Sequence, residues 1–364
     1  MIRDGKTLRA RAATAFAAAL VLLGGVSGAA LADNDENRGW TRSGLTPDVN
    51  DPDIAGDLDY GVCRGTDPRC YHDWAGEDGQ RAATPKVLIY TRTAGPRHAN
   101  LGPRLGPGLN PALTPANVVQ NSLIRWMAAK GVTADWTEDV SWMNSPGRLH
   151  PYRAVIFAST SRDTLFAHGR AVGMTTNSQG QVVQDASLPV NTSTGAHLDA
   201  AKTALRQYMR AGGGFVGIHN AFGTEYNWPY YEGLLGNTNY YDHGANQDGT
   251  AVVIAQDSST AGLPPRWPFK DEWYNLRPFP TKVKFLVNVD ENSLATRREI
   301  HPGHGKFHPV AWCQYYDGGR VWVTTLGHDG QAFTEGSPFP GQAHFQSMIT
   351  NGILSAMGLL PFCQ

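Results

Sequence analysis

The chain has 364 residues, of which 41% are hydrophobic and 17% are charged, and its formal net charge at pH 7 is -1. This composition is typical of a globular, enzyme-sized protein with one large domain or two modest ones. A surface that is neutral to mildly acidic argues against nucleic acid or anionic lipid as the partner.

The first 32 residues have the pattern of a secretory signal peptide. Basic residues precede the apolar run AATAFAAALVLLGGV, and ALA at 30–32 suits a signal peptidase. No later stretch approaches the roughly 20 apolar residues that a membrane-spanning helix needs. We therefore expect an exported protein without a membrane anchor. Its net charge becomes -4 after cleavage, because the segment carries four basic residues and one acidic residue.

Four cysteines in an exported chain indicate disulfides rather than metal ligands or a free nucleophile. Cys63 and Cys70 lie in one polar loop and are expected to pair, which leaves Cys313 and Cys363. Four cysteines nevertheless permit three connectivities, and the sequence leaves that choice open. Cys313 lies inside the apolar segment VAWCQYY, where burial or a bridge would make its thiol unreactive.

Residues 33–85 are rich in Asp, Gly, Pro and Asn without an apolar period, which predicts a loop-rich N-terminal arm. From residue 86 onward, strand and helix patterns alternate. The expected elements are strands at 86–91, 132–139, 153–159 and 214–219, and helices at 115–130 and up to about 209. Alternation of this kind predicts a parallel sheet that is covered on both faces.

The second half predicts further strands and a closing helix. These elements are strands at 250–255, 282–289, 309–316 and 320–327, a hairpin turn at YDGG between the last two, and a helix over 345–357. We expect residues 86–364 to form one α/β domain, a three-layer α/β/α sandwich with a mostly parallel central sheet.

Candidate site residues follow the predicted strands. Ligands of parallel sheets bind outside the carboxyl ends of the strands, and Arg97, His98, residues 159–163 and His219 all follow such ends. We expect them to meet at one edge. The glycines before Phe215 and the sharp exit after it resemble a nucleophile elbow. A histidine there would be an acid, a base or a metal ligand; the alternative is that it only caps the turn.

Four segments carry a family resemblance: YTRTAGPRHANL, AGGGFVGIHNAFGTEYNWPYYEGLLG, DEWYNLRPFPTKVKFLVNVDE and FHPVAWCQYYDGGRVWVTTLGH. Together they resemble the ThuA-like (trehalose utilisation) family from about residue 86 to 360. The resemblance implies a class I glutamine amidotransferase-like fold and a role in carbohydrate metabolism. It also implies site positions at Arg97, His98, His219, Glu225, Tyr226, Asp271, Glu272, His308 and His328.

The expected chemistry is acid–base catalysis. We expect His219 or His98 to transfer a proton, with Glu225 or Glu272 as the complementary acid or base, and His328 is a further catalytic candidate by the same resemblance. Two carboxylates would suit cleavage of a glycosidic bond.

Adjacent side chains on an extended backbone face opposite ways. Only one of Asp271 and Glu272 should therefore reach the site, and we favour Glu272.

Other side chains are candidates for holding the substrate. Arg97 could bind a hydroxyl or carboxylate, or it could be an ordinary solvated loop arginine. Tyr226, Trp228 and Tyr241 are candidates to stack on a sugar ring. Asn220 stands beside the turn, where a small residue is common in the family.

Two loops suggest further features. Residues 164–195 extend the loop after the third strand, and we expect a lid or a substrate wall there, or else a surface excursion without a role. The loop HPGHGKFHP holds His301, His304 and His308, which would suit a divalent metal such as zinc or calcium. Hydrogen-bonded loop histidines are the alternative.

The sequence thus predicts a secreted carbohydrate-active enzyme, a hydrolase or lyase that cleaves or modifies a glycoside of an oligosaccharide or polysaccharide. A sugar-binding module without catalysis and a metal-dependent hydrolase are the alternatives.

Overall fold

The computed structural model describes residues 58–59, 62–165, 174–176, 182–184, 200–226, 228–296 and 303–364. The expected signal peptide, most of the 164–195 segment and His301 lie outside the described residues. The chain divides into two compact units, residues 1–62 and 63–364, so the second unit contains residues 63–85 of the expected arm together with the α/β domain. Among the described residues, no helix has the length and apolar character needed to cross a bilayer.

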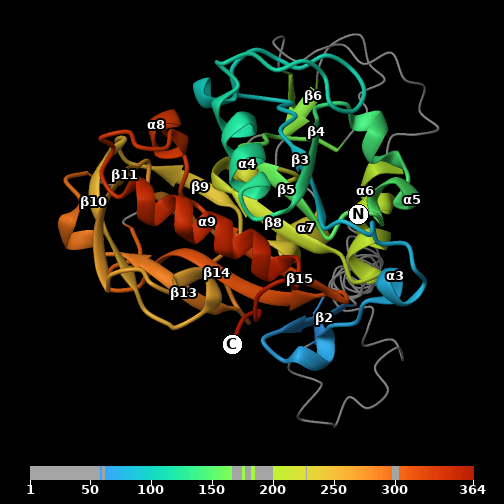
Figure 1. Ribbon diagram of the computed structural model, residues 1–364. Coiled ribbons are helices and arrows are strands. Elements are labelled where there is room, and N and C mark those ends of the chain that lie inside the picture. Colours follow the sequence, from blue (N-terminus) through green and yellow to red (C-terminus); the bar gives the residue numbers. More distant parts are fainter. Residues whose placement is uncertain are drawn as a thin grey trace, which may run out of the picture. The chain divides into compact units, whose positions relative to one another are not determined.

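A mixed sheet runs through the second unit in the order β11-β10-β13-β14-β15-β8-β5-β3-β4 (Figure 1). Its strands are β3 (Lys86–Tyr90), β4 (Thr133–Thr137), β5 (Ala154–Ala158), β8 (Gly214–Ile218), β10 (Gln247–Val253), β11 (Arg266–Asp271), β13 (Lys284–Val289), β14 (His308–Tyr316) and β15 (Gly319–Thr324). The expected α/β class is confirmed. The sheet joins a parallel half, from β4 to β15, to an antiparallel half, from β15 to β11.

Helices cover both faces of the parallel half. They are α4 (Val118–Ala128), α5 (Pro146–Leu149), α6 (Ala200–Arg210), α7 (Pro229–Leu234), α8 (Gly330–Phe333) and α9 (Gln342–Ala356). α9 crosses the sheet in Figure 1 and packs on β15, β8 and β5, and α8 links α9 to α4. On the opposite face, Phe215 of β8 contacts Phe157 of β5 and Tyr231 of α7. Burial on both faces explains why GFVGI is a continuous apolar run.

A separate antiparallel ribbon lies against the turn that follows β8. It consists of β9 (Tyr240–His243) and β12 (Tyr274–Leu276), and it packs on η6 (His219–Gly223). Sequence analysis did not predict these two strands, because three or four residues are too few to show a period. A second short hairpin, β6 (Met174–Thr176) with β7 (Val182–Gln184), lies within the long insertion.

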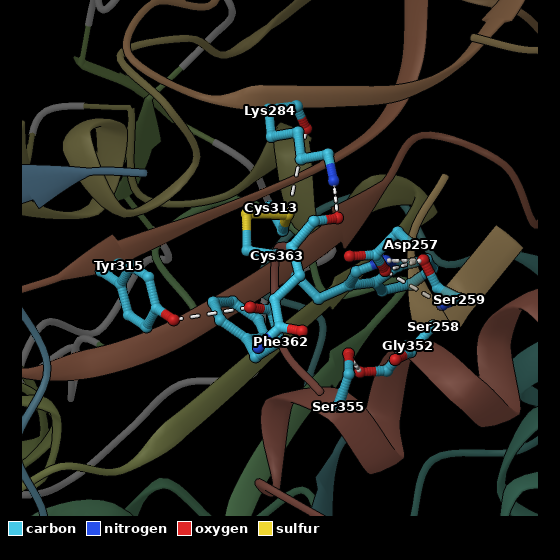
Figure 2. Close-up of a disulfide and its surroundings, with 12 residues drawn as sticks. Asp257, Ser258, Ser259, Lys284, Cys313, Tyr315, Gly352, Ser355, Phe362 and Cys363 are labelled. Carbon is cyan, nitrogen blue, oxygen red and sulfur yellow. Dashed lines mark hydrogen bonds between the residues drawn. A yellow bond between two sulfur atoms is a disulfide. The ribbon is translucent and has the colours of Figure 1, made fainter. Parts of the chain in front are cut away.

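The four cysteines form two disulfides, Cys63–Cys70 and Cys313–Cys363. Figure 2 shows the second bridge beside a hydrogen bond from the Tyr315 hydroxyl to the carbonyl of Phe362. Both contacts hold the last residues of the chain against β14. The short bridge holds a loop next to β2 (Val62–Gly65), which pairs with β14.

Removal of the Cys313–Cys363 bridge should cost more stability than removal of Cys63–Cys70. The bridged residues are 50 and 7 positions apart, and loop-closure entropy predicts losses of about 4 and about 2 kcal/mol. Urea unfolding of the two double Cys→Ala variants and the wild type measures the losses. Equal losses would contradict the loop-length argument.

Candidate active site

Four polar side chains meet at the carboxyl edge of the parallel half. His98 follows β3, His219 follows β8, His328 follows β15, and Glu272 comes from the connection between β11 and β12. β15, β8, β5 and β3 are adjacent and parallel, so their carboxyl ends open on the same edge. The structure thus brings His98 and His219 together, and we call these four residues the histidine–glutamate cluster.

His219 makes the sharp turn that its position requires. Its φ of +54° lies in the left-handed region, which costs a non-glycine residue about 1 kcal/mol or more. Its Nδ1 lies 2.9 Å from the carbonyl oxygen of Thr325, just after β15. Because a carbonyl can only accept, Nδ1 carries the proton and Nε2 keeps its lone pair.

The ligand-capable atoms of the cluster lie within 4.8 Å of one another. His98 Nε2 is 3.1 Å from His219 Nε2, and His328 Nδ1 is 3.2 Å from Glu272 Oε2. Glu272 Oε2 also lies 3.7 Å from His219 Nε2 and 4.0 Å from His98 Nε2. Two ligands about 2.1 Å from one tetrahedral ion are about 3.4 Å apart. The four atoms therefore have the spacing of ligands around a single cation.

Hydrogen bonds satisfy only part of this arrangement. The lone pair of His219 Nε2 faces two potential donors, the Tyr274 hydroxyl at 2.9 Å and His98 Nε2 at 3.1 Å. His328 Nδ1 is buried and makes no hydrogen bond to the described residues, although Glu272 is close. A buried imidazole nitrogen without a hydrogen bond beside a carboxylate, and a second nitrogen that two donors share, fit a bound cation better than a closed hydrogen-bond network.

The protonation states of His98, His219 and Glu272 also fit a cation, whereas His328 is shifted toward its charged form by Glu272. Burial and the neighbouring imidazoles hold the pKa of His219 well below its usual value and lower the pKa of His98 to about 4. Burial acts to lower the pKa of His328, but the Glu272 carboxylate acts more strongly, so the pKa of His328 is raised overall. Burial acts to raise the pKa of Glu272, but the histidines lower it overall. Neutral imidazoles and an ionised carboxylate are the forms that bind metal ions.

Asp271 orients its neighbour Glu272. One Asp271 oxygen accepts a hydrogen bond from the Gly327 N–H at 2.7 Å, and the other accepts from the Glu272 N–H at 2.8 Å. Burial raises the pKa of Asp271. Of the two adjacent carboxylates, Glu272 faces the histidines, whereas Asp271 is hydrogen-bonded to the loop after β15.

A cavity of about 270 Å³ opens beside the cluster. Its wall includes Asn220 and Tyr226, which were predicted to hold substrate, together with Arg162, Tyr240 and His243. The volume is near the lower end of the roughly 300–1,000 Å³ of usual ligand sites. The cavity therefore suits a small polar ligand.

Two predicted site residues, Arg97 and Glu225, make structural contacts. Arg97 Nη2 lies 2.8 Å from Glu138 Oε1, and its guanidinium also donates to nearby backbone carbonyls. Glu225 is buried, accepts a hydrogen bond from the Leu165 N–H and lies 3.0 Å from Lys202 Nζ. Partners occupy both side chains, and neither joins the cluster. Arg97 also lines a neighbouring cavity of about 360 Å³ with His98 and His328, so its role in holding substrate stays a prediction.

Trp228 and Tyr241 are not among the described residues that line the cavity. Trp228 stacks on Tyr230, with ring centroids 5.3 Å apart, and the guanidinium of Arg277 lies 5.4 Å from the ring centre of Tyr241. Tyr240 faces the cavity in place of Tyr241, since neighbouring residues of a strand point to opposite sides.

The histidine-rich loop supports the ribbon. His308 is buried, with Nδ1 2.8 Å from Glu291 Oε1 and Nε2 2.9 Å from the carbonyl oxygen of Tyr274. His304 Nε2 accepts a hydrogen bond from a backbone N–H of β12. In the described part of the chain, the group that could hold a metal is the histidine–glutamate cluster. His304 and His308 thus have hydrogen-bond partners, and the expected ligand set with His301 stays a prediction because His301 lies outside the described residues.

Three further side chains lie near the cluster. Tyr274 places its hydroxyl 2.9 Å from His219 Nε2, and His243 Nε2 lies 3.6 Å from Glu272 Oε1. Both residues belong to the short ribbon, which gave no periodic signal. Arg162 follows β5 and is one of residues 159–163, which were expected at this edge because they follow a predicted parallel strand.

The sequence model of one protein family, ThuA, described as trehalose utilisation, matches residues 86–356. This protein belongs to the ThuA family. The matched range includes every member of the histidine–glutamate cluster. The description of the ThuA family relates it to carbohydrate metabolism.

Solved structures of ThuA-like proteins resemble this ThuA protein in fold. One from Bacteroides uniformis has 20% sequence identity and a TM-score of 0.50, over 75% of this chain and 91% of that chain. Another from Parabacteroides merdae has 16% identity and a TM-score of 0.48, over 75% and 90% of the two chains. No curated protein sequence matches the chain significantly.

Replacement of His308 should destabilise the protein without removing a metal ligand. His308→Ala removes one hydrogen-bond partner from the buried Glu291 carboxylate and one from the Tyr274 carbonyl, which should lower the free energy of unfolding by about 2–3 kcal/mol. Urea unfolding measures the loss, and the partly exposed His344→Ala is the control, with a change within about 0.5 kcal/mol. Unchanged stability with loss of bound metal would instead favour the histidine-rich loop as the metal site.

Proposed function

We propose that this protein is a metal-dependent enzyme that acts on a carbohydrate. The observation that carries the proposal is the spacing of the ligand atoms of His98, His219, His328 and Glu272, all within 4.8 Å of one another. Membership of the ThuA family supports a sugar as the ligand. The polar cavity beside the cluster supplies groups that could bind its hydroxyls.

The ligand set favours zinc or a similar transition metal over calcium. Three imidazole nitrogens and one carboxylate oxygen suit zinc-like ions, whereas calcium takes six to eight oxygen ligands. His219 also has the second hydrogen bond that orients most ligating histidines, from Nδ1 to the Thr325 carbonyl.

A cation held by these residues would supply Lewis-acid polarisation of a substrate oxygen. His243 is placed to move a proton next to it. The Nδ1 of His243 lies 2.6 Å from the carbonyl oxygen of Gly244, so Nδ1 carries the proton and the Nε2 lone pair is available at the cavity. The Tyr274 hydroxyl lines the same cavity and can donate to a substrate oxygen.

This arrangement favours a histidine base over a two-carboxylate glycosidase mechanism. The latter needs two carboxyl groups on either side of the scissile bond, and Glu225 is paired with Lys202 instead. Cation-assisted hydrolysis of a glycosidic bond and elimination beside the keto group of an oxidised sugar both fit the geometry. The proposal therefore includes a hydrolase or a lyase.

Export is part of the same proposal. The signal-like first 32 residues and the two disulfides support it, because disulfides persist in oxidising compartments. An exported enzyme of this family would meet oligosaccharides or polysaccharides.

The purified protein should bind about one zinc-like ion per chain. Single His98→Ala, His219→Ala and Glu272→Gln substitutions each remove one ligand of the cluster and should weaken metal binding more than tenfold. Competition with a chelator, followed by elemental analysis, measures the affinity. His344→Ala is the matched control, and unchanged binding in all three cluster variants would refute the proposed site.

Loss of His243 should separate catalysis from metal binding. His243→Ala leaves the four cluster residues intact and should keep the metal while reducing turnover about 100-fold. Incubation with a glycan library, read by mass spectrometry, measures turnover with and without a chelator. Sugar binding without turnover of any glycan would indicate a sugar-binding module.

A further inference from the structure

Arg162 lies on the wall of the cavity beside the histidine–glutamate cluster. It follows β5 at the carboxyl edge and lines the cavity together with Tyr226 and Glu272. Its Nη1 is buried and has no hydrogen-bond partner among the described residues. The described part of the chain also places no carboxylate in ion-pair contact with its guanidinium, in contrast to Arg97 beside Glu138.

The backbone and stem of Arg162 are held firmly in place. Its φ is +56°, its N–H donates to the carbonyl of Gly223, and its own carbonyl accepts from the Glu225 N–H. A Cβ at Gly95 would lie 2.2 Å from Arg162 Cγ, so the stem rests on a position that only glycine can occupy. The guanidinium carbon lies 5.5 Å from the ring centre of Tyr226. The side chain is therefore preorganised for a ligand.

The guanidinium of Arg162 is partly buried, and its buried Nη1 has no partner among the described residues. Charges that lose contact with water are normally paired and hydrogen-bonded, and a guanidinium is well shaped to bind a carboxylate or phosphate through two hydrogen bonds. A ligand in the cavity is placed to supply that partner.

The charge of the neighbouring cluster reinforces this attraction. The cluster has three imidazoles and one carboxylate, so its ligands carry at most one negative charge and a bound divalent cation would leave a net positive charge. This part of the argument rests on the proposed metal site, whereas the contacts of Arg162 do not.

We infer that the substrate is an acidic sugar, whose anionic group, a carboxylate or a phosphate ester, binds Arg162 while its hydroxyls face the histidine–glutamate cluster. Arg162 is accordingly a specificity-determining residue. Its loss should reduce the preference for the charged sugar and leave the metal in place.

Calorimetric titration of the full protein with D-glucuronate, D-glucose 6-phosphate and D-glucose tests the inference. The wild type should bind at least one of the anionic sugars about 10- to 100-fold more tightly than glucose. The anionic sugar that binds more tightly relative to glucose identifies the anionic group as carboxylate or phosphate. Arg162→Gln should abolish the preference, whereas Arg148→Gln should keep it. Arg148 is a matched control, since it also lies over an aromatic ring, that of Trp142 at 5.0 Å.

Salt dependence gives a second measurement that needs no variant. In the wild type, affinity for the anionic sugar should fall as sodium chloride rises, while affinity for glucose should not. Equal affinities for glucose and both anionic sugars, or an unchanged preference in Arg162→Gln, would overturn the inference. Metal content measured on the same samples keeps the two proposals separate, because metal-free protein with an Arg162-dependent preference would contradict only the metal site.

Discussion

The hydrogen bond from His219 to the carbonyl of Thr325 is the contact on which the candidate site depends. It joins the ends of β8 and β15, and it decides which ring nitrogen of His219 carries the proton. It forms because the backbone leaves β8 through a left-handed residue, which turns the imidazole back over the sheet edge. With that ring in place, the parallel strands β15 and β3 bring His328 and His98 to the same point.

Charged side chains in this domain divide into two kinds. Away from the cavity they are matched by partners from other elements, as Arg97 is by Glu138 and Glu225 is by Lys202. At the cavity, the Glu272 carboxylate lies among imidazoles and faces the space where a ligand would bind. The first kind stabilises loop positions, and the second kind marks where chemistry can occur.

The fold was more predictable from the sequence than the site. Continuous apolar runs and alternating helices predicted the parallel half, and the rule that ligands bind at the carboxyl ends of strands brought His98 and His219 together. The partners of Arg97 and Glu225 come from distant segments and leave no local pattern. His308 was misleading for the same reason, since Glu291 and a backbone carbonyl occupy its ring.

The ribbon of β9 and β12 carries Tyr240, His243 and Tyr274, whereas the sheet edge carries the three clustered histidines. The ribbon thus supplies part of the wall that touches a ligand, whereas the histidines that would anchor an ion come from a different piece of the chain. Change in the ribbon can alter which molecule is accepted while those histidines stay as they are. Diversification within such an architecture therefore has a natural route, through a few positions on one small ribbon.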